Sequence, residues 1–183
     1  MAENDVPIEV TMPDMDLSDA ESEKLPSVGW HPAMLIDVLT AYKKEDLELP
    51  EKYRRRNYIL IPELHADDPE MPGYKNLGKI YIPMPTPAEI EFNAKFKSAS
   101  KEAKKSMMLE NPEMVTKDGR TKCAQKMAWI KQAATCFGGK ETGKFDKNFF
   151  SKQIGQKFMI DVVHEAYQGD PQARVSFMGI KPA

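Results

Sequence analysis

Three segments in the first half of the chain carry the hydrophobic pattern of β-strands. Residues 28–42, VGWHPAMLIDVLTAY, are rich in apolar and β-branched residues and hold too few polar positions for an amphipathic helix. Two more strands are predicted over residues 57–65 and 79–85, after loops rich in charge, Pro and Gly. In the first strand we expect two partly covered faces, with Ala33, Leu35 and Leu39 on one and Trp30, Met34, Ile36, Val38 and Tyr42 on the other.

The chain then changes to a helical period. Thr86-Pro87-Ala88-Glu89 is a capping box with proline at the first helical position, so a helix should begin there. Its apolar stripe continues at spacings of three and four through Phe92, Phe96, Ala99, Ala103 and Met107. A second helix is predicted from Thr121 to Phe137, where Gly138-Gly139 ends it, with a stripe of Cys123, Met127, Ile130, Ala134 and Phe137.

The C-terminal residues return to strand patterns. Strands are predicted over residues 157–165 and 174–180, on either side of the turn signal Tyr167-Gln168-Gly169-Asp170-Pro171, so they should form a hairpin. Five strands interrupted by helix after the third follow the order of the OB fold. The sequence therefore predicts a mainly β (α+β) fold, a five-stranded OB-fold barrel with an enlarged two-helix insertion at about residues 86–138, between strands 3 and 4.

Charge divides the chain into two regions. Residues 1–27 hold eight acidic residues and one lysine, a net charge of -7, which leaves +5 for residues 28–183 out of a total of -2. We therefore expect an acidic, flexible N-terminal arm (1–27) and a basic domain (28–183). The arm is either a solubilising tail or a segment that competes with nucleic acid or docks partner proteins. No apolar run reaches the length of a membrane span, and the acidic N-terminus is unlike a signal peptide, which favours a cytoplasmic protein with no membrane partner.

The sequence gives little support for a catalytic site or a metal site. Gly138, Gly143 and Lys144 have Walker spacing, but Phe145 stands where a magnesium-binding hydroxyl is required. The three histidines, His31, His65 and His164, lie on different predicted strands, without the spacing of a zinc site. Cys123 and Cys136, thirteen positions apart on one predicted helix, are too distant for a disulfide and are expected in the core. We expect no enzyme, metal or cofactor.

Three stretches carry a resemblance to a known group of proteins. They are PSVGWHPAMLIDV (26–38), KMAWIKQAATCFG (126–138) and IGQKFMIDVVHEAYQGDPQARVSF (154–177). The chain resembles bacteriophage OB-fold proteins of the single-stranded-DNA-binding type over most of residues 26–183. The resemblance implies binding of single strands without sequence specificity during phage DNA replication or recombination in the infected cell. The long basic loop between strands 1 and 2, the double helical insertion and the N-terminal position of the acidic segment depart from that pattern.

Single strands are held by a positive groove along the backbone and by aromatic rings on which bases stack. Basic and aromatic residues meet at the start of the second strand and around the third, which should be neighbours across a hairpin. The tyrosines could instead be half-buried strand residues, and the arginines a solvated loop. Trp30, Trp129 and Phe177 are assigned to the core. The predicted nucleic-acid-binding residues are Lys43, Lys44, Tyr53, Arg54, Arg55, Arg56, Tyr58, Tyr74, Lys75, Lys79, Tyr81 and Arg174.

The function predicted from these features is non-sequence-specific binding of single-stranded DNA, without cleavage. Phage or host replication and recombination proteins are the expected protein partners, and the sequence leaves an oligomer open. The alternative is an OB-fold interaction module of a replication or recombination complex with little DNA binding of its own. In that alternative, the adaptable docking face would be the methionines of the helical insertion, Met107, Met108, Met114 and Met127.

Overall fold

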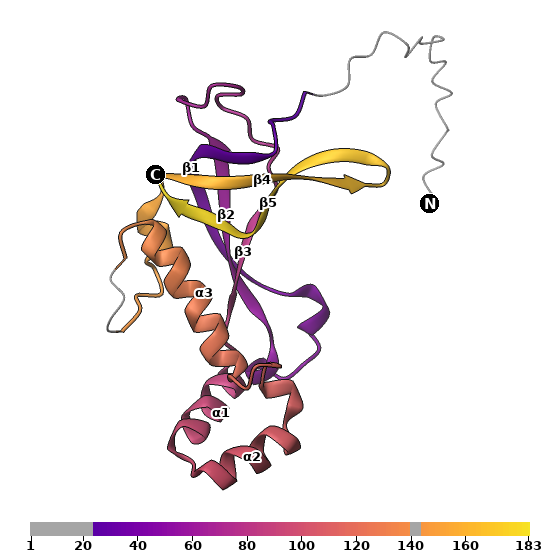
Figure 1. Cartoon of the computed structure of the whole chain (residues 1–183), viewed down its shortest axis with the longest axis vertical. Helices are drawn as coiled ribbons and strands as arrows, with labels where there is room; N and C mark the ends of the chain where they lie inside the picture. Colours follow the sequence, from indigo (N-terminus) through magenta and orange to yellow (C-terminus); the bar gives the residue numbers. More distant parts are fainter. Residues whose placement is uncertain (1–23, 140–143) are drawn as a thin grey trace, which may run out of the picture.

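Five antiparallel strands form one sheet that curls into a half-barrel, accompanied by three helices (Figure 1). The description rests on a computed structural model and covers residues 24–139 and 144–183. The sheet order is β3-β2-β1-β4-β5, which is consistent with an OB-like fold and confirms the predicted mainly β class. The strands are β1 Gly29–Tyr42, β2 Arg56–Leu64, β3 Ile80–Met84, β4 Lys157–Tyr167 and β5 Asp170–Pro182.

The long strand β1 organises the sheet because two neighbours share it. Its first part pairs with β4, with Trp30 opposite Asp161, and its later part pairs with β2, with Leu39 opposite Ile59. The edge strands β3 and β5 approach each other, although no ladder joins them within the described ranges. The sheet is thus open along this line.

A β-bulge changes which side chains of β1 face the core. The pairing with β2 shifts between Leu35 and Asp37, and one extra residue in a strand moves every later side chain to the opposite face. Ala33 and Leu35 are fully buried, but beyond the bulge Val38 packs against the core while Leu39 is 43% exposed. The predicted division of β1 into two faces is therefore wrong beyond the bulge.

One apolar core lies between the curled sheet and helix α3 (Lys122–Cys136). α3 packs along β3 and β5 and buries Ile130, Ala133, Ala134 and Phe137 against Leu60 and Phe158. Each fully buried Leu, Ile or Phe side chain stabilises the fold by about 1.5–3 kcal/mol. Cys123 and Cys136 are both buried on α3 and both free, as predicted.

The first predicted helix of the insertion is two helices, α1 (Pro87–Ser98) and α2 (Lys101–Glu110). The capping box is confirmed, since the Glu89 amide donates to Thr86 Oγ1 and the Thr86 amide donates to Glu89 Oε2. The break falls at Ala99, whose backbone is extended, and Ser100 caps α2 by accepting from the Ala103 amide. Serine flanks this position on both sides and competes with helical hydrogen bonds, so the stripe alone did not show the break.

Turns end the remaining elements much as the residue types indicate. Gly138 adopts a φ of 74° after α3, and the Gly139 amide donates to the Ala134 carbonyl, which confirms the predicted glycine cap. Gln168 and Gly169 form a two-residue turn with positive φ angles, so the β4–β5 hairpin is longer than predicted. Short 3-10 turns complete the structure at Lys44–Asp46, Glu51–Tyr53, Pro112–Met114 and Phe150–Gln153.

The last residues of the predicted N-terminal arm pack on the domain. Pro26 is buried, and its carbonyl accepts a 2.7 Å hydrogen bond from His164 Nε2. Ser27 donates to Glu70, and its carbonyl lies 2.8 Å from Nε2 of the buried His31. Residues 1–23, which carry the acidic charge of the arm, lie outside the described residues.

His31 anchors this segment to the loop between β2 and β3. Its Nδ1 lies 2.7 Å from Asp68 Oδ2, so both ring nitrogens face acceptors, as they do in an imidazolium. Burial alone would lower the pKa of His31, but the hydrogen bonds to Asp68 and Ser27 and the negative charges of Asp68 and Glu70 raise it above 6.5.

No helix in the described ranges is long and apolar enough to cross a bilayer.

Candidate nucleic-acid interface

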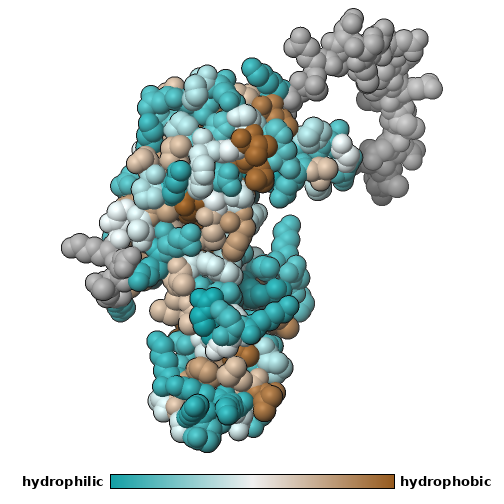
Figure 2. Space-filling view, viewed as in Figure 1, coloured by the Kyte–Doolittle hydropathy of each residue, from teal (hydrophilic) through white to brown (hydrophobic). Residues whose placement is uncertain are grey.

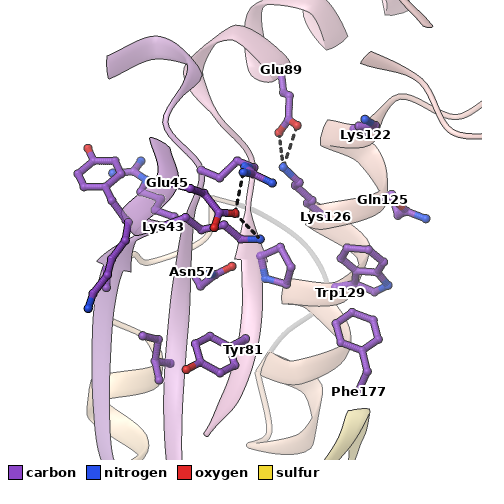
Figure 3. A pocket seen from close by; sticks show the side chains of 17 residues that line it. Lys43, Glu45, Asn57, Tyr81, Glu89, Lys122, Gln125, Lys126, Trp129 and Phe177 are labelled. Atoms are coloured by element: carbon purple, nitrogen blue, oxygen red, sulfur yellow. Dashed lines mark hydrogen bonds and ion pairs between the residues drawn. The ribbon is translucent and has the colours of Figure 1, made fainter. Parts of the chain in front are cut away.

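A groove of about 790 Å³ runs between the sheet and helix α3 (Figure 3). We call it the β2–α3 groove. It is formed by the end of β1, the loop between β1 and β2, strands β2 and β3, helix α3, and one residue each of α1 and β5. Its lining consists of Ala41, Tyr42, Lys43, Lys44, Glu45, Arg55, Arg56, Asn57, Ile59, Tyr81, Pro83, Glu89, Lys122, Gln125, Lys126, Trp129 and Phe177.

The floor of the groove is the face of β2 and β3 that points away from the core. Side chains alternate along a strand, so Tyr58 and Leu60 enter the core while Asn57 and Ile59 face the groove. The register sets Ile59 opposite Tyr81 on β3, which is 49% exposed. The floor is therefore apolar and aromatic around one amide side chain.

The α3 wall follows from helical spacing. Lys122, Gln125, Lys126 and Trp129 stand at intervals of three, one and three, which places them on one face of the helix. Figure 3 shows these four side chains along α3, with Phe177 beside Trp129. The two rings meet edge to face, with centroids 5.2 Å apart and an interplanar angle of 87°. This pair presents an aromatic surface opposite Tyr81.

The groove is positively charged, and part of its charge is uncompensated. Six basic side chains line it against two acidic ones. Lys126 Nζ lies 2.8 Å from the Glu89 carboxylate, and Lys43 approaches Glu45 at 4.0 Å. By contrast, Lys44, Arg56 and Lys122 make no side-chain hydrogen bond or ion pair with any residue in the described ranges. These three cations are available to a ligand.

Arg55 has a structural partner in Asp46. The Asp46 carboxylate accepts from the Arg55 amide at 2.8 Å and from its guanidinium Nε and Nη2 at 2.7 Å each. These hydrogen bonds with Arg55 outweigh burial and lower the pKa of Asp46 from 3.8 to about 2. Asp46 thus holds the β1–β2 loop in shape, with Lys43 and Lys44 at the groove.

The Asp46–Arg55 pair predicts a dependence of stability on pH. Because the pKa of Asp46 is lowered on folding, the pair stabilises the folded state above 3.8, and this contribution is lost as the pH falls through about 2. We expect the difference in unfolding free energy between the natural protein and Asp46→Asn to shrink from pH 6 to pH 2 in denaturant titrations. A pH-independent difference for Asp46→Asn would contradict this assignment.

The structure brings five of the predicted site residues into the groove: Lys43, Lys44, Arg55, Arg56 and Tyr81. Three neighbours of Arg55 in sequence lie elsewhere. Tyr53 is exposed beside Lys52, and the Arg54 guanidinium donates to the Leu49 carbonyl. Tyr58 is only 4% exposed and packs edge to face on Phe150. The Tyr58 ring is a core group and offers no stacking platform.

The two aromatic and basic clusters lie on paired strands, as predicted, but only Tyr81 of the second cluster reaches the groove with Arg55 and Arg56. Arg56 pairs with Met84, at one end of the β2–β3 hairpin, whereas the Leu64 amide donates to the Tyr74 carbonyl at the other end. A separate pocket of about 290 Å³ contains Tyr74 and Arg174 but does not join the β2–α3 groove. The predicted residues outside the groove at this end are Tyr74, Lys75, Lys79 and Arg174.

The sequence-based prediction missed the α3 wall. Trp129 is half-buried and Phe177 is 64% exposed, so the core assignment of these two rings is wrong. Trp30, also assigned to the core, is 45% exposed, with Lys181 Nζ 4.0 Å above its ring. One signal could have located the wall, because Lys122, Lys126 and Trp129 form a stripe that runs beside the apolar stripe of α3.

No protein-family model matches this chain, and no curated protein matches it either. The resemblance to phage single-strand-binding proteins therefore stays a prediction. Over residues 24–139 and 144–183, no three His, Cys, Asp or Glu side chains are grouped as metal ligands would be.

Proposed function

We propose that this protein binds single-stranded DNA in the β2–α3 groove, without sequence specificity and without cleaving it. One observation carries the proposal: a single groove combines three uncompensated cations with the exposed rings of Tyr81 and Phe177. Proteins that bind single strands combine a positive groove with aromatic stacking platforms in this way.

The cations are placed at the rim of the groove. Lys44 comes from the β1–β2 loop, Arg56 from the first residue of β2 and Lys122 from the first turn of α3. They therefore border the groove on both the sheet side and the helix side, and phosphates of one strand could lie against each in turn. The rings of Tyr81, Trp129 and Phe177 line the same groove and offer apolar surface to bases.

We further propose that the half-barrel is an OB fold whose second and third strands face the ligand. In OB folds, this face and the loop between strands 1 and 2 bind oligonucleotides. The β2–α3 groove is built from these elements together with α3. The likeness of residues 26–38, 126–138 and 154–177 to phage proteins supports a role in phage DNA replication or recombination in the cytoplasm of the infected cell.

Titration of a fluorescently labelled oligo(dT) with the full chain at two salt concentrations tests this function. Each phosphate neutralised on a single strand lowers log K by about 0.7 per log unit of salt. If Lys44, Arg56 and Lys122 each neutralise one phosphate, the slope should be roughly -2. A duplex of the same length serves as competitor. Failure to bind oligo(dT) at low salt, or a preference for the duplex, would overturn the proposal.

The helical insertion favours one alternative, an interaction module for a replication or recombination protein. Neither α1 nor α2 contributes a buried apolar side chain, and Leu109 is 83% exposed and Ile90 51% exposed. Figure 2 shows brown, hydrophobic areas on the lower lobe, where Figure 1 places these helices. Two results together would support this alternative. The protein would not bind DNA, and it would bind a replication protein through a contact that Leu109→Lys abolishes.

A further inference from the structure

Asn57 is an exception among the buried polar residues of the described chain. It is 8% exposed, and its side chain makes no hydrogen bond with any described residue. Seven other polar or charged residues are also buried, and each has a side-chain hydrogen-bond partner: His31, Asp46, Asp68, Thr86, Glu89, Asn93 and Thr121. No fully buried side-chain nitrogen or oxygen of the described residues lacks a partner, so the amide atoms of Asn57 are not sealed inside the protein and stay open to an occupant of the β2–α3 groove.

The Asn57 side chain is directed at the β2–α3 groove. Its strand neighbours are Ala41 on β1 and Pro83 on β3, which offer no side-chain polar group. In Figure 3 it projects from β2 into the space between the strands and α3. Ile59, Tyr81 and the Trp129–Phe177 pair supply apolar and aromatic surface around this space. A ligand group that meets Asn57 must therefore fit between apolar and aromatic walls and also carry hydrogen-bonding atoms.

A nucleobase has both properties. A carboxamide presents an acceptor and a donor side by side, which matches the adjacent donor and acceptor on a base edge, as in bidentate pairing of Asn with adenine. Bases of a single strand expose their Watson–Crick and Hoogsteen edges, and their faces stack on aromatic rings. A phosphate group accepts hydrogen bonds only and gains nothing from apolar walls.

We propose that Asn57 binds the edge of one nucleobase while the base lies against the aromatic surface of the groove, an inference that rests on the proposed function above. Arg56, the residue before Asn57 on β2, is free to hold the adjoining phosphate. The groove thus recognises a base and not only the charged backbone. Because an amide can orient its donor and acceptor either way, every base can be bound, which is compatible with binding that lacks sequence specificity.

The test compares two single strands of equal length, one with all bases and one with abasic sugars at its central positions. We expect the natural protein to bind the complete strand more tightly than the abasic one. In Asn57→Leu the ratio of these two affinities should fall roughly five- to tenfold, which is the effect of one or two hydrogen bonds. Leucine has a similar volume, and no side-chain hydrogen bond of Asn57 with a described residue is lost, so stability should change little, which a thermal melt would check.

Asn57→Asp provides the second variant. A carboxylate can only accept, so it pairs with the exocyclic amino groups of adenine and cytosine and repels the carbonyl groups of thymine. The ratio of affinities for oligo(dC) and oligo(dT) should rise severalfold relative to the natural protein. If the natural protein binds neither strand, the proposed function fails. The inference about Asn57 is overturned if the natural protein binds both strands but neither variant changes the binding. In that case, folded Asn57→Leu keeps the full preference for the strand with bases, and Asn57→Asp keeps the natural ratio of affinities for oligo(dC) and oligo(dT).

Discussion

Replacing Lys44, Arg56 and Lys122 together with glutamine is expected to weaken binding of a single-stranded oligonucleotide by roughly two to three orders of magnitude at low salt. Each side chain is uncompensated, and a hydrogen bond to a charged group contributes about 1.5 kcal/mol or more, which is about tenfold in affinity. The salt dependence should weaken too, with the slope of log K against log salt smaller by about 2. Anisotropy titrations at several salt concentrations measure both quantities.

A matched control separates the groove from general attraction. Lys101, Lys105 and Lys117 are exposed residues of the helical insertion that do not line the groove. Replacing these three with glutamine changes the net charge equally, yet should alter affinity only slightly. Neither variant should lose stability, because none of the six lysine and arginine side chains makes a described ion pair. Equal weakening by both variants would show that DNA is attracted to the whole basic surface and not held in the groove.

Local sequence signals account for most of the fold. Alternation and β-branched content located all five strands, and the Thr86–Glu89 capping box and the glycines after Phe137 located two helix ends. These signals act through neighbouring residues, so they can be read without knowing the rest of the structure. The sequence pattern did not reveal the break at Ala99, because the apolar stripe of α1 and α2 continues through it unchanged.

The candidate site was predictable only in part, because it depends on contacts between distant segments. Lys43, Lys44, Arg55 and Arg56 are adjacent to a predicted strand end, and the β1–β2 loop holds them at the groove. The separation of Tyr74 from Arg56 follows from the β2–β3 register, which no local pattern specifies. Phe177 and Trp129 meet only because α3 crosses the edge of β5, so their spacing in sequence says nothing of their contact.

Phe177 offers the sharpest test of base stacking in the groove. Its ring is 64% exposed and touches Trp129 from β5, so truncation removes aromatic surface from the groove and little from the core. Stacking of a base on an aromatic ring contributes about 1–3 kcal/mol, so Phe177→Ala should lower affinity for oligo(dT) by roughly 5- to 150-fold. The midpoint of denaturant unfolding should change little.

The chemistry of the replacement then decides what the ring contributes. Phe177→Tyr retains an aromatic face and should bind like the natural protein, whereas Phe177→Leu retains apolar area without that face and should bind nearly as weakly as Phe177→Ala. Tyr167→Ala is the matched control, since this ring is 56% exposed at the tip of the β4–β5 hairpin and does not line the groove. Full binding by Phe177→Leu would mean that the ring acts as apolar surface alone. Equal losses in Phe177→Ala and Tyr167→Ala would place the bound strand outside the groove.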